Sequence, residues 1–275
     1  MKENKRGMIL AIDMGNTNIV IGCIDDKKIY FEERISTDHQ KTELEYAVSF
    51  KTVLELHGIN PEQIDGAILS SVVPQLNKAI REAVEKVIGI CPLLVGAGIK
   101  TGLNIRMDQP RSVGSDLIVD AVAALNFYGA PAVIIDTGTA TTFSVIDENK
   151  NYVGGIIIPG LQVSVDSLVS RTAQLPRIAL EAPDKVIGKN TVHCMQSGAV
   201  YGYASMIDGL ITRVEMEAGF RDASMSVSEP GRCKVIATGG LARVIIPVCE
   251  RKDIIVDNEL LLKGLKVIYD KNVEA

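Results

Sequence analysis

Two aspartates of the sequence, Asp13 and Asp136, each end an apolar run and are followed two residues later by a glycine. Small hydroxyl or amide residues come next, and a second apolar run then reaches an acidic turn, as in 11–26 (AIDMGNTNIVIGCIDD) and 134–148 (IIDTGTATTFSVIDE). A glycine-bearing turn between adjacent strands exposes backbone N–H groups that can surround a phosphate. Because a carboxylate repels a phosphate, each aspartate is suited to holding a cation between the two.

A single Asp-x-Gly turn is more simply interpreted as an ordinary hairpin turn. Two copies in matched surroundings favour phosphate binding instead. The copies are separated by far more than the roughly 20–50 residues of a solenoid repeat, so the pattern indicates a duplicated domain. The chain of 275 residues is long enough for two such domains. We expect an N-terminal domain over 1–129 and a C-terminal domain over 130–275, with the boundary near Gly129.

The expected elements follow the same order in both halves. In the first half, three strands, a helix, a buried strand and a second helix are predicted over 8–13, 18–25, 27–37, 42–58, 64–73 and 75–89. A helix over 110–129 links the halves. In the second half, strands are expected over 130–138, 141–150, 152–160 and 234–240, with helices over much of 160–218 and from 241 onward. The sequence therefore predicts an α/β protein.

The composition favours a small-molecule substrate. A net charge of −5 and an isoelectric point near 5.4 are not typical of a nucleic-acid-binding protein, which usually presents a basic surface. The basic start MKENKRG precedes an apolar run too short for a signal peptide, and we expect no membrane-spanning segment. The five cysteines are scattered without a Cys-x-x-Cys pair, which is typical of a protein of the reduced cytoplasm.

A glycine pair, Gly239 and Gly240, lies between a buried strand and a helix of the second half. On its own such a pair is a flexible connection. Together with two phosphate loops, it resembles the actin, sugar-kinase and heat-shock-chaperone ATPase superfamily. The resemblance implies duplicated actin-like (ribonuclease H-like) domains, a nucleotide cleft between them, and a purine close to the backbone of the glycine pair. The segment 96–102 (GAGIKTG) lacks the spacing of a P-loop and is interpreted as a loop.

Within this superfamily, the sequence resembles the type III pantothenate kinases over nearly its whole length. The motifs that carry the resemblance are DMGNTN (13–18), KTGLNIRMDQPRSVGSD (100–116), DTGTATT (136–142), GGIIIPG (154–160), RTAQLP (171–176), GKNTVHCMQSG (188–198) and ATGGLA (237–242). The resemblance implies ATP-dependent phosphorylation of pantothenate, the first step of coenzyme A synthesis. It also implies a homodimer that uses Mg²⁺ and a monovalent cation.

The resemblance assigns roles to individual positions. The first phosphate loop would bind ATP through Asp13, Met14, Gly15, Asn16, Thr17, Asn18, Ile19 and Val20, with Asp13 next to Mg²⁺. Thr139, Gly239 and Gly240 would contact ATP from the second half, and Asp136 would bind the monovalent cation, K⁺ or NH₄⁺. Asp116 would be the catalytic base. The rest of the substrate would contact Gly114, Ser115, Leu117 and Thr191.

Asp116 has suitable chemistry for this role. A primary alcohol needs a carboxylate within hydrogen-bonding reach, while positioning and charge neutralisation supply most of phosphoryl transfer. From the residues alone, Asp116 could equally be the N-cap of the helix that it opens. The family resemblance favours the catalytic role, and a helix N-terminus would stabilise the charged form of the carboxyl group.

Two positions depart from the family pattern. Leu117 stands where the family has the arginine of Gly-x-Asp-Arg, and Met107 lies in a segment that normally contains a tyrosine. Leu117 lacks a guanidinium that could pair with the pantothenate carboxylate. Arg106, Arg111 or Arg171, the last of these from the partner subunit, are candidates to replace it.

The departures keep an alternative open, in which the chain is a catalytically impaired paralogue that binds ATP as a regulator or scaffold. A sugar kinase of the same superfamily is a weaker alternative, because the sequence has no Cys/His zinc cluster of the kind found in repressor-type sugar kinases.

Overall fold

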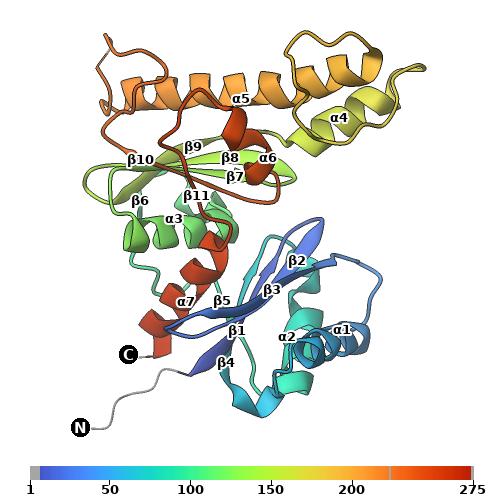
Figure 1. The fold of residues 1–275 in the computed structure, drawn as a ribbon. Helices are drawn as coiled ribbons and strands as arrows, with labels where there is room; N and C mark the ends of the chain where they lie inside the picture. Colours follow the sequence, from blue (N-terminus) through green and yellow to red (C-terminus); the bar gives the residue numbers. More distant parts are fainter. Residues whose placement is uncertain (1–6, 223, 274–275) are drawn as a thin grey trace. The chain divides into compact units, whose positions relative to one another are not determined.

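The computed structural model describes residues 7–222 and 224–273, and the chain forms two compact units (Figure 1). Unit 1 consists of Met1–Gly102, Arg111–Asn126 and Glu259–Ala275, and unit 2 of Leu103–Pro110 and Phe127–Asn258. The chain passes from unit 1 to unit 2 between Asn126 and Phe127, close to the boundary expected near Gly129. The expected ranges 1–129 and 130–275 are nevertheless wrong for two segments, because 103–110 joins unit 2 and 259–275 joins unit 1.

Unit 1 is built on a five-stranded sheet in the order β3-β2-β1-β4-β5. Its strands are β1 (Met8–Met14), β2 (Asn18–Ile24), β3 (Ile29–Ser36), β4 (Ile64–Ser71) and β5 (Leu93–Leu94). β1 runs antiparallel to β2 and parallel to β4. Every residue of β1 is buried, because helices cover both faces of this sheet (Figure 1).

The helices of unit 1 are α1 (Glu43–Leu56), α2 (Asn77–Ile88), α3 (Ser115–Phe127) and α7 (Leu260–Val273), with short 3₁₀ turns η1 (Pro61–Gln63), η2 (Pro74–Leu76) and η3 (Pro110–Ser112). Apolar side chains of α1 and α2 form one core with the sheet. α7 packs closely enough that a side chain at Gly22 or Gly66 would collide with Leu262 or Tyr269. This close packing is the physical reason why the end of the chain belongs to unit 1.

Unit 2 contains a six-stranded sheet in the order β11-β10-β7-β8-β9-β6. Its strands are β6 (Asn104–Ile105), β7 (Ala132–Thr137), β8 (Ala140–Ile146), β9 (Asn151–Pro159), β10 (Lys234–Thr238) and β11 (Ile255–Val256). β6 pairs with β9, which explains why 103–110 joins this unit.

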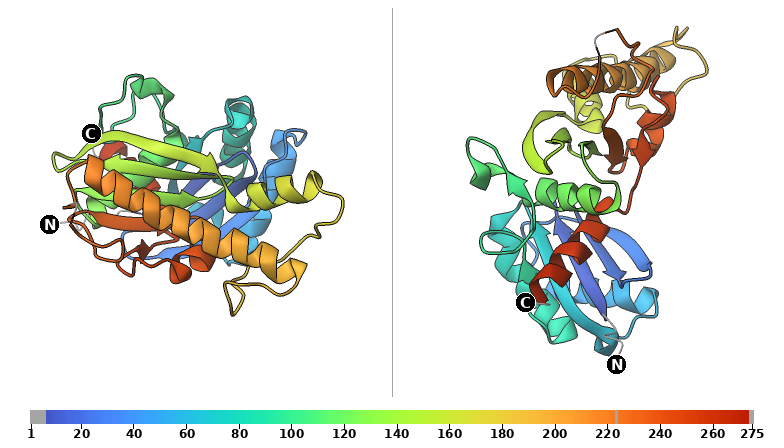
Figure 2. Two further views of the ribbon diagram at one scale, coloured as in Figure 1. Left: turned by 90° about the horizontal axis from the view of Figure 1, so that it is seen from above. Right: turned by 90° about the vertical axis from the view of Figure 1, so that its left-hand side faces the viewer.

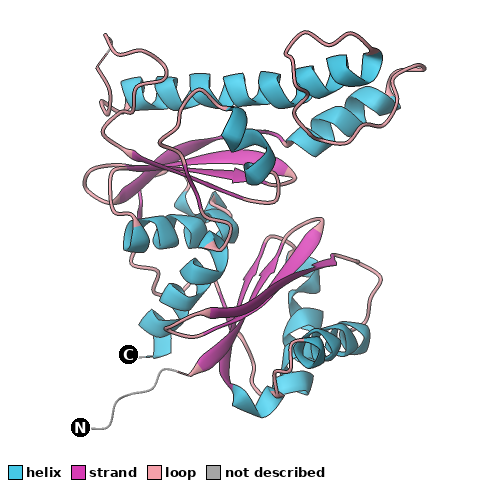
Figure 3. Ribbon diagram, in the orientation of Figure 1, coloured by secondary structure: helices cyan, strands magenta, loops and turns pink. Residues whose placement is uncertain are grey.

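The helices of unit 2 are α4 (Leu161–Ser170), α5 (Thr191–Glu217) and α6 (Ala242–Ile245), followed by η4 (Ile246–Val248). Their apolar side chains form a core with one face of the sheet, and α5 crosses over this sheet (Figure 2). The segment 171–190 between α4 and α5 contains no helix or strand (Figure 3).

The two sheets repeat one topology. β7 runs antiparallel to β8 and parallel to β10, as β1 does to β2 and β4. β9 and β11 occupy the places of β3 and β5. The structure thus confirms the duplicated α/β fold expected from the two hairpins.

Within 7–222 and 224–273, no helix is both long and apolar enough to span a membrane. Residues 1–6, which include most of the basic start considered above, lie outside the described residues.

Candidate active site

The first phosphate loop is the turn between β1 and β2. The N–H of Gly15 donates to the carbonyl of Asn18 at 3.0 Å, and Asn16, Thr17 and Asn18 are exposed. Thr37, which follows β3, anchors the turn through its hydroxyl, which donates to the Gly15 carbonyl at 2.7 Å. The N–H of Thr37 also donates to the Thr17 carbonyl, at 2.9 Å. The loop is therefore held through its backbone N–H and carbonyl groups, while its side chains reach solvent.

Asp13 lies just before this turn and is 8% exposed. It pairs with Val20 of β2 and with Ser70 of β4 in the sheet register, so two neighbouring strands fix its backbone. A carboxylate with so little access to water needs compensating partners. Carboxylate oxygen is a preferred ligand of Mg²⁺, so the donor at this position fits the expected cation.

The corresponding turn of unit 2 joins β7 and β8. The N–H of Gly138 donates to the carbonyl of Ala140 at 3.0 Å, and the carbonyl of Thr139 accepts from the Gly160 N–H at 3.0 Å. Thr137 donates its hydroxyl to the carbonyl of Thr238 in β10 at 2.8 Å. Gly138 and Thr139 are exposed, whereas in the first loop Gly15 is half-buried and Asn16 is exposed.

The glycine pair lies next to Asp136. Gly239 has φ +91°, and a β-carbon at this position would collide with the Asp136 carboxylate. Asp136 pairs with Thr238, the last residue of β10, so the strand register sets this contact. A side chain at 239 would fill the space beside the carboxylate, and its absence leaves room for a cation or for a nucleotide close to the backbone.

Asp116 is the second residue of α3, in the first helical turn. The alternative role of N-cap is therefore wrong. Its Oδ1 atom accepts from the Leu117 N–H at 2.9 Å. Burial nevertheless raises the pKa of Asp116, and this effect outweighs the hydrogen bonds from the N–H groups of Leu117 and of Asp116 itself, which lower it. The N–H groups at the helix N-terminus thus favour the charged form, as expected, but desolvation is the larger effect and the pKa is raised.

Gly114 and Ser115 shape the surroundings of this carboxylate. A β-carbon at Gly114 would collide with Asp116 Oδ1. The hydroxyl of Ser115 forms hydrogen bonds with Ser70 and Ser71 at the end of β4. Sequence reasoning missed this contact. The serine pair was visible at the end of an expected strand, but nothing in the sequence pointed to its partner.

Residues 9–213 match the sequence profile of type III pantothenate kinase. The chain is 46% identical over 266 residues to a type III pantothenate kinase of Halalkalibacterium halodurans, with 97% of this chain and 100% of that protein covered. The chain belongs to the type III pantothenate kinase family.

Solved structures with low sequence identity share the fold of this pantothenate kinase family member. The activator of 2-hydroxyisocaproyl-CoA dehydratase from Clostridium difficile, with bound ADPNP, has a TM-score of 0.52 at 13% identity, covering 97% of this chain and 95% of that chain. The (R)-2-hydroxyglutaryl-CoA dehydratase component A from Acidaminococcus fermentans has a TM-score of 0.54 at 15% identity, covering 97% and 98%. They support the actin-like fold alone.

The remaining positions expected to bind pantothenate are distributed between the units. Leu117 is half-buried in unit 1. Met107, in unit 2, places its sulfur 4.0 Å from where a β-carbon of Gly154 would lie. Thr191, the first residue of α5, lines a mainly apolar cavity of about 430 Å³ between α4 and α5. Arg171 follows α4 and lines a shallow hollow with Arg177.

Among the described residues there is no group of three or more His, Cys, Asp or Glu side chains that could hold a metal ion. Asp13 and Asp136 are single carboxylates of the kind that would share a cation with a phosphate. Their roles, and those of Thr139, Thr191 and Arg171, remain predictions.

Proposed function

We propose that this chain transfers the γ-phosphoryl group of ATP to the primary hydroxyl of pantothenate, giving 4′-phosphopantothenate for coenzyme A synthesis. Membership of the type III pantothenate kinase family supports this function. The single structural observation that carries it is Asp116, a carboxyl group with a raised pKa in a helical turn tied to the strand next to β1.

Asp116 acts as the base in this proposal. It accepts the hydroxyl proton while the hydroxyl oxygen forms a bond to the γ-phosphorus, and ADP leaves with the electrons of the broken P–O bond. A raised pKa makes the carboxylate a stronger base, and such a base is most effective when its pKa approaches the working pH. Gly114 leaves space for the Asp116 carboxylate.

The two glycine turns bind the ATP phosphates through backbone N–H groups. Asp13 holds Mg²⁺ and Asp136 holds K⁺ or NH₄⁺, while Gly239 and Gly240 accommodate the purine. When bound, these cations neutralise phosphate charge, which is the main requirement of phosphoryl transfer. Activity should accordingly be higher in K⁺ or NH₄⁺ than in Na⁺.

We also propose a homodimer located in the cytoplasm. Exposed apolar side chains on α4, Val163 at 42% and Leu168 at 47%, and Val192 of α5 at 39%, lie in unit 2 and are suited to a protein interface. All five cysteines are free thiols, as is usual in a reducing compartment.

The test is ADP release by one protein preparation with and without pantothenate. Asp116→Asn should lower pantothenate-dependent turnover by about 10²–10⁴-fold and leave ATP binding nearly unchanged. Asp184→Asn, at an exposed position of the loop between α4 and α5, is the matched control and should keep wild-type turnover. ATP binding without any pantothenate turnover in the wild type would instead favour the catalytically impaired paralogue.

A further inference from the structure

All hydrogen-bonding positions of the Ser115 hydroxyl are occupied by residues of one neighbouring element, the strand β4. It accepts from the Ser71 N–H at 3.0 Å and from the Ser70 hydroxyl at 3.0 Å, and it donates to the Ser71 carbonyl at 2.9 Å. A serine hydroxyl has one donor and two acceptor positions. All three are occupied, so the hydroxyl has no capacity left for a substrate.

These contacts are not helix capping. A capping serine accepts from N–H groups of its own helix, whereas Ser115 already belongs to α3 and bonds to β4. At the start of the helix, the carbonyl of Gly114 accepts from the Ile118 N–H at 3.2 Å. The Ser115 hydroxyl therefore joins two elements instead of stabilising one.

The strand to which Ser115 is joined is the neighbour of the first phosphate loop. Ser70 and Ser71 pair with Asp13 and Met14 of β1, and the pairing continues through the Val72 N–H, which donates to the Met14 carbonyl at 3.0 Å. The Ser115 hydroxyl and these backbone contacts thus connect the start of α3, through β4, to the strand that carries Asp13.

The position of the Asp116 carboxylate depends on the first turn of α3. The hydrogen bonds to this carboxylate come from backbone N–H groups of the same turn, those of Leu117 and of Asp116 itself. Because the carboxylate and its donors belong to one turn, a shift of that turn would carry the carboxylate with it.

We propose that Ser115 is a positioning residue, whose hydroxyl fixes the first turn of α3 against the end of β4 and thereby sets the place of the Asp116 carboxylate relative to the strand that carries Asp13. The inference rests on the proposed kinase function for its catalytic consequence. The tether itself involves only residues of unit 1.

The kinetic test is a double-mutant cycle. Ser115→Ala should lower kcat by about 10- to 100-fold, because a displacement of about 1 Å can cost about 10²-fold in rate, and should change the KM for ATP little. In the Asp116→Asn background, Ser115→Ala should cause no further loss, since its effect passes through the carboxylate. Ser115→Thr retains the hydroxyl and should restore most of kcat.

The matched control is Ser49→Ala in α1, where the hydroxyl donates only to the Glu45 carbonyl, at 2.9 Å; it should leave kcat unchanged. Wild-type kcat in Ser115→Ala would overturn the proposal, and so would an equal loss with and without the Asp116 carboxylate.

A second readout separates this proposal from the kinase function. Carbon-13 NMR titration of the Asp116 carboxyl group, assigned by its loss in Asp116→Asn, needs no substrate. In Ser115→Ala the loosened turn should admit water and bring the pKa of Asp116 back towards the usual value. An unchanged pKa would overturn the tether even in an active enzyme. A shifted pKa in a protein without pantothenate turnover would uphold the tether and reject the kinase function.

Discussion

Asp116 is held in surroundings that disfavour its charged form. Burial raises its pKa above the usual value, so the folded protein holds the Asp116 proton more tightly than the unfolded chain does. Ionisation of this carboxyl group therefore lowers the stability of the fold at neutral pH, and the penalty disappears once pH falls below the unfolded pKa of about 3.9. A destabilised group of this kind is typical of a functional site.

The raised pKa predicts the acid side of the activity profile. In the proposed mechanism the ionised carboxylate is the active base, so kcat/KM for pantothenate should fall as pH drops through a pKa above about 3.9. In Asp116→Asn the acid limb of the residual activity should be lost, and the thermal midpoint at neutral pH should equal or exceed that of the wild type. An acid limb centred at the usual aspartate pKa would contradict a raised pKa of Asp116. An Asp116→Asn variant clearly less stable than the wild type would contradict it as well.

The departure at Leu117 leads to a second prediction at the scale of a residue. Leu117 follows Asp116 directly, and its N–H donates to the Asp116 carboxylate. Leu117→Arg should lower the KM for pantothenate by about 10- to 100-fold, since a charge-assisted contact is worth about 1.5–3 kcal/mol, without much change in the KM for ATP. Steady-state kinetics, alone and with Met107→Tyr, would measure this. If the substitution weakens pantothenate binding, another residue already holds the substrate carboxylate, and Arg171 of the partner subunit is the first candidate.

The sequence predicted the acidic and glycine positions of the site but not their supports. Asp13 and Asp136 stood out because local neighbours, an apolar run and a glycine, define their surroundings. The partner of Ser115 is a strand end 44 positions away in the chain, and no local pattern encodes that contact. The desolvation that raises the pKa of Asp116 was not predicted either, because burial of a side chain depends on elements that are distant in sequence.

At the scale of elements, the sequence predicted the repeated strand order. It did not predict the sheet against which the last helix, α7, packs. The apolar positions of α7 indicate a buried face, but they do not indicate which sheet covers it. Gly22 and Gly66 allow this helix to approach the sheet of unit 1. Their function as contact positions became apparent only in the structure.

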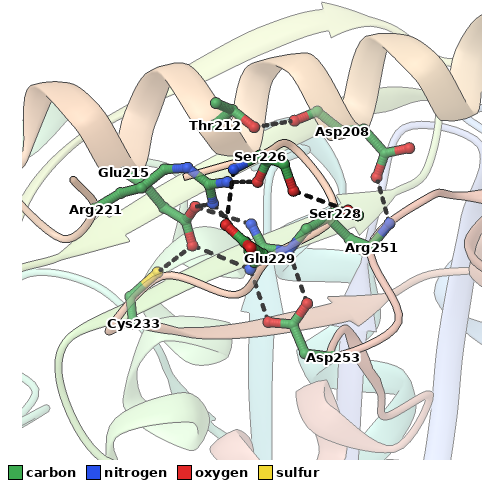
Figure 4. Close-up of polar contacts among 10 residues, drawn as sticks. All are labelled: Asp208, Thr212, Glu215, Arg221, Ser226, Ser228, Glu229, Cys233, Arg251 and Asp253. Atoms are coloured by element: carbon green, nitrogen blue, oxygen red, sulfur yellow. Dashed lines mark hydrogen bonds and ion pairs between the residues drawn. The ribbon is translucent and has the colours of Figure 1, made fainter. Parts of the chain in front are cut away.

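A buried ionic network joins several elements of unit 2 (Figure 4). Glu215, near the end of α5, accepts from Arg221 at 2.9 Å and from Arg251 at 2.8 and 3.1 Å, and these three side chains are 0% exposed. Arg251 also donates twice to Asp253, both at 2.7 Å. Cys233, just before β10, lies 3.4 Å from Glu215. The network therefore connects α5 to the strand that leads to the glycine pair.

Removal of the central carboxylate should strongly destabilise unit 2. Glu215→Gln removes the negative charge that two buried guanidinium groups share, and breaking a buried ion pair in this way costs about 3–5 kcal/mol. Urea unfolding followed by circular dichroism would measure the loss. Glu217→Gln, at an exposed position of the same helix, is the control and should change stability little. Equal stability of the two variants would contradict a structural role for the network.

The same network has a defined pH dependence. Hydrogen bonds from Arg251 hold the pKa of Asp253 below its usual value. The stabilisation from this pair is therefore fully present above the unfolded pKa of about 3.9 and is lost as pH falls through the lower folded value.

At the scale of the whole molecule, the duplicated units account for the two matching glycine turns that we propose to bind the nucleotide, while exposed apolar side chains of unit 2 support the proposed homodimer. Leu168 of α4 and Val192 of α5 are exposed, and Leu168 lines the apolar cavity between these helices. Water contact with such a surface is unfavourable at about 25 cal/mol per Å², and a second copy of the chain would cover it.

This surface yields the last prediction. The wild type should sediment as a dimer at micromolar concentration, and Leu168→Glu should shift it to monomers, because a dimer would bury the introduced charge without a partner. Leu56→Glu, at a position of α1 in unit 1 that is 78% exposed, is the matched control and should leave the dimer intact. If Arg171 of the partner subunit holds the pantothenate carboxylate, the monomeric variant should also show a raised KM for pantothenate with ATP binding unchanged. A monomeric wild type would reject the homodimer, whereas a monomeric variant with an unchanged KM would retain the dimer and assign the carboxylate to a residue of the same chain.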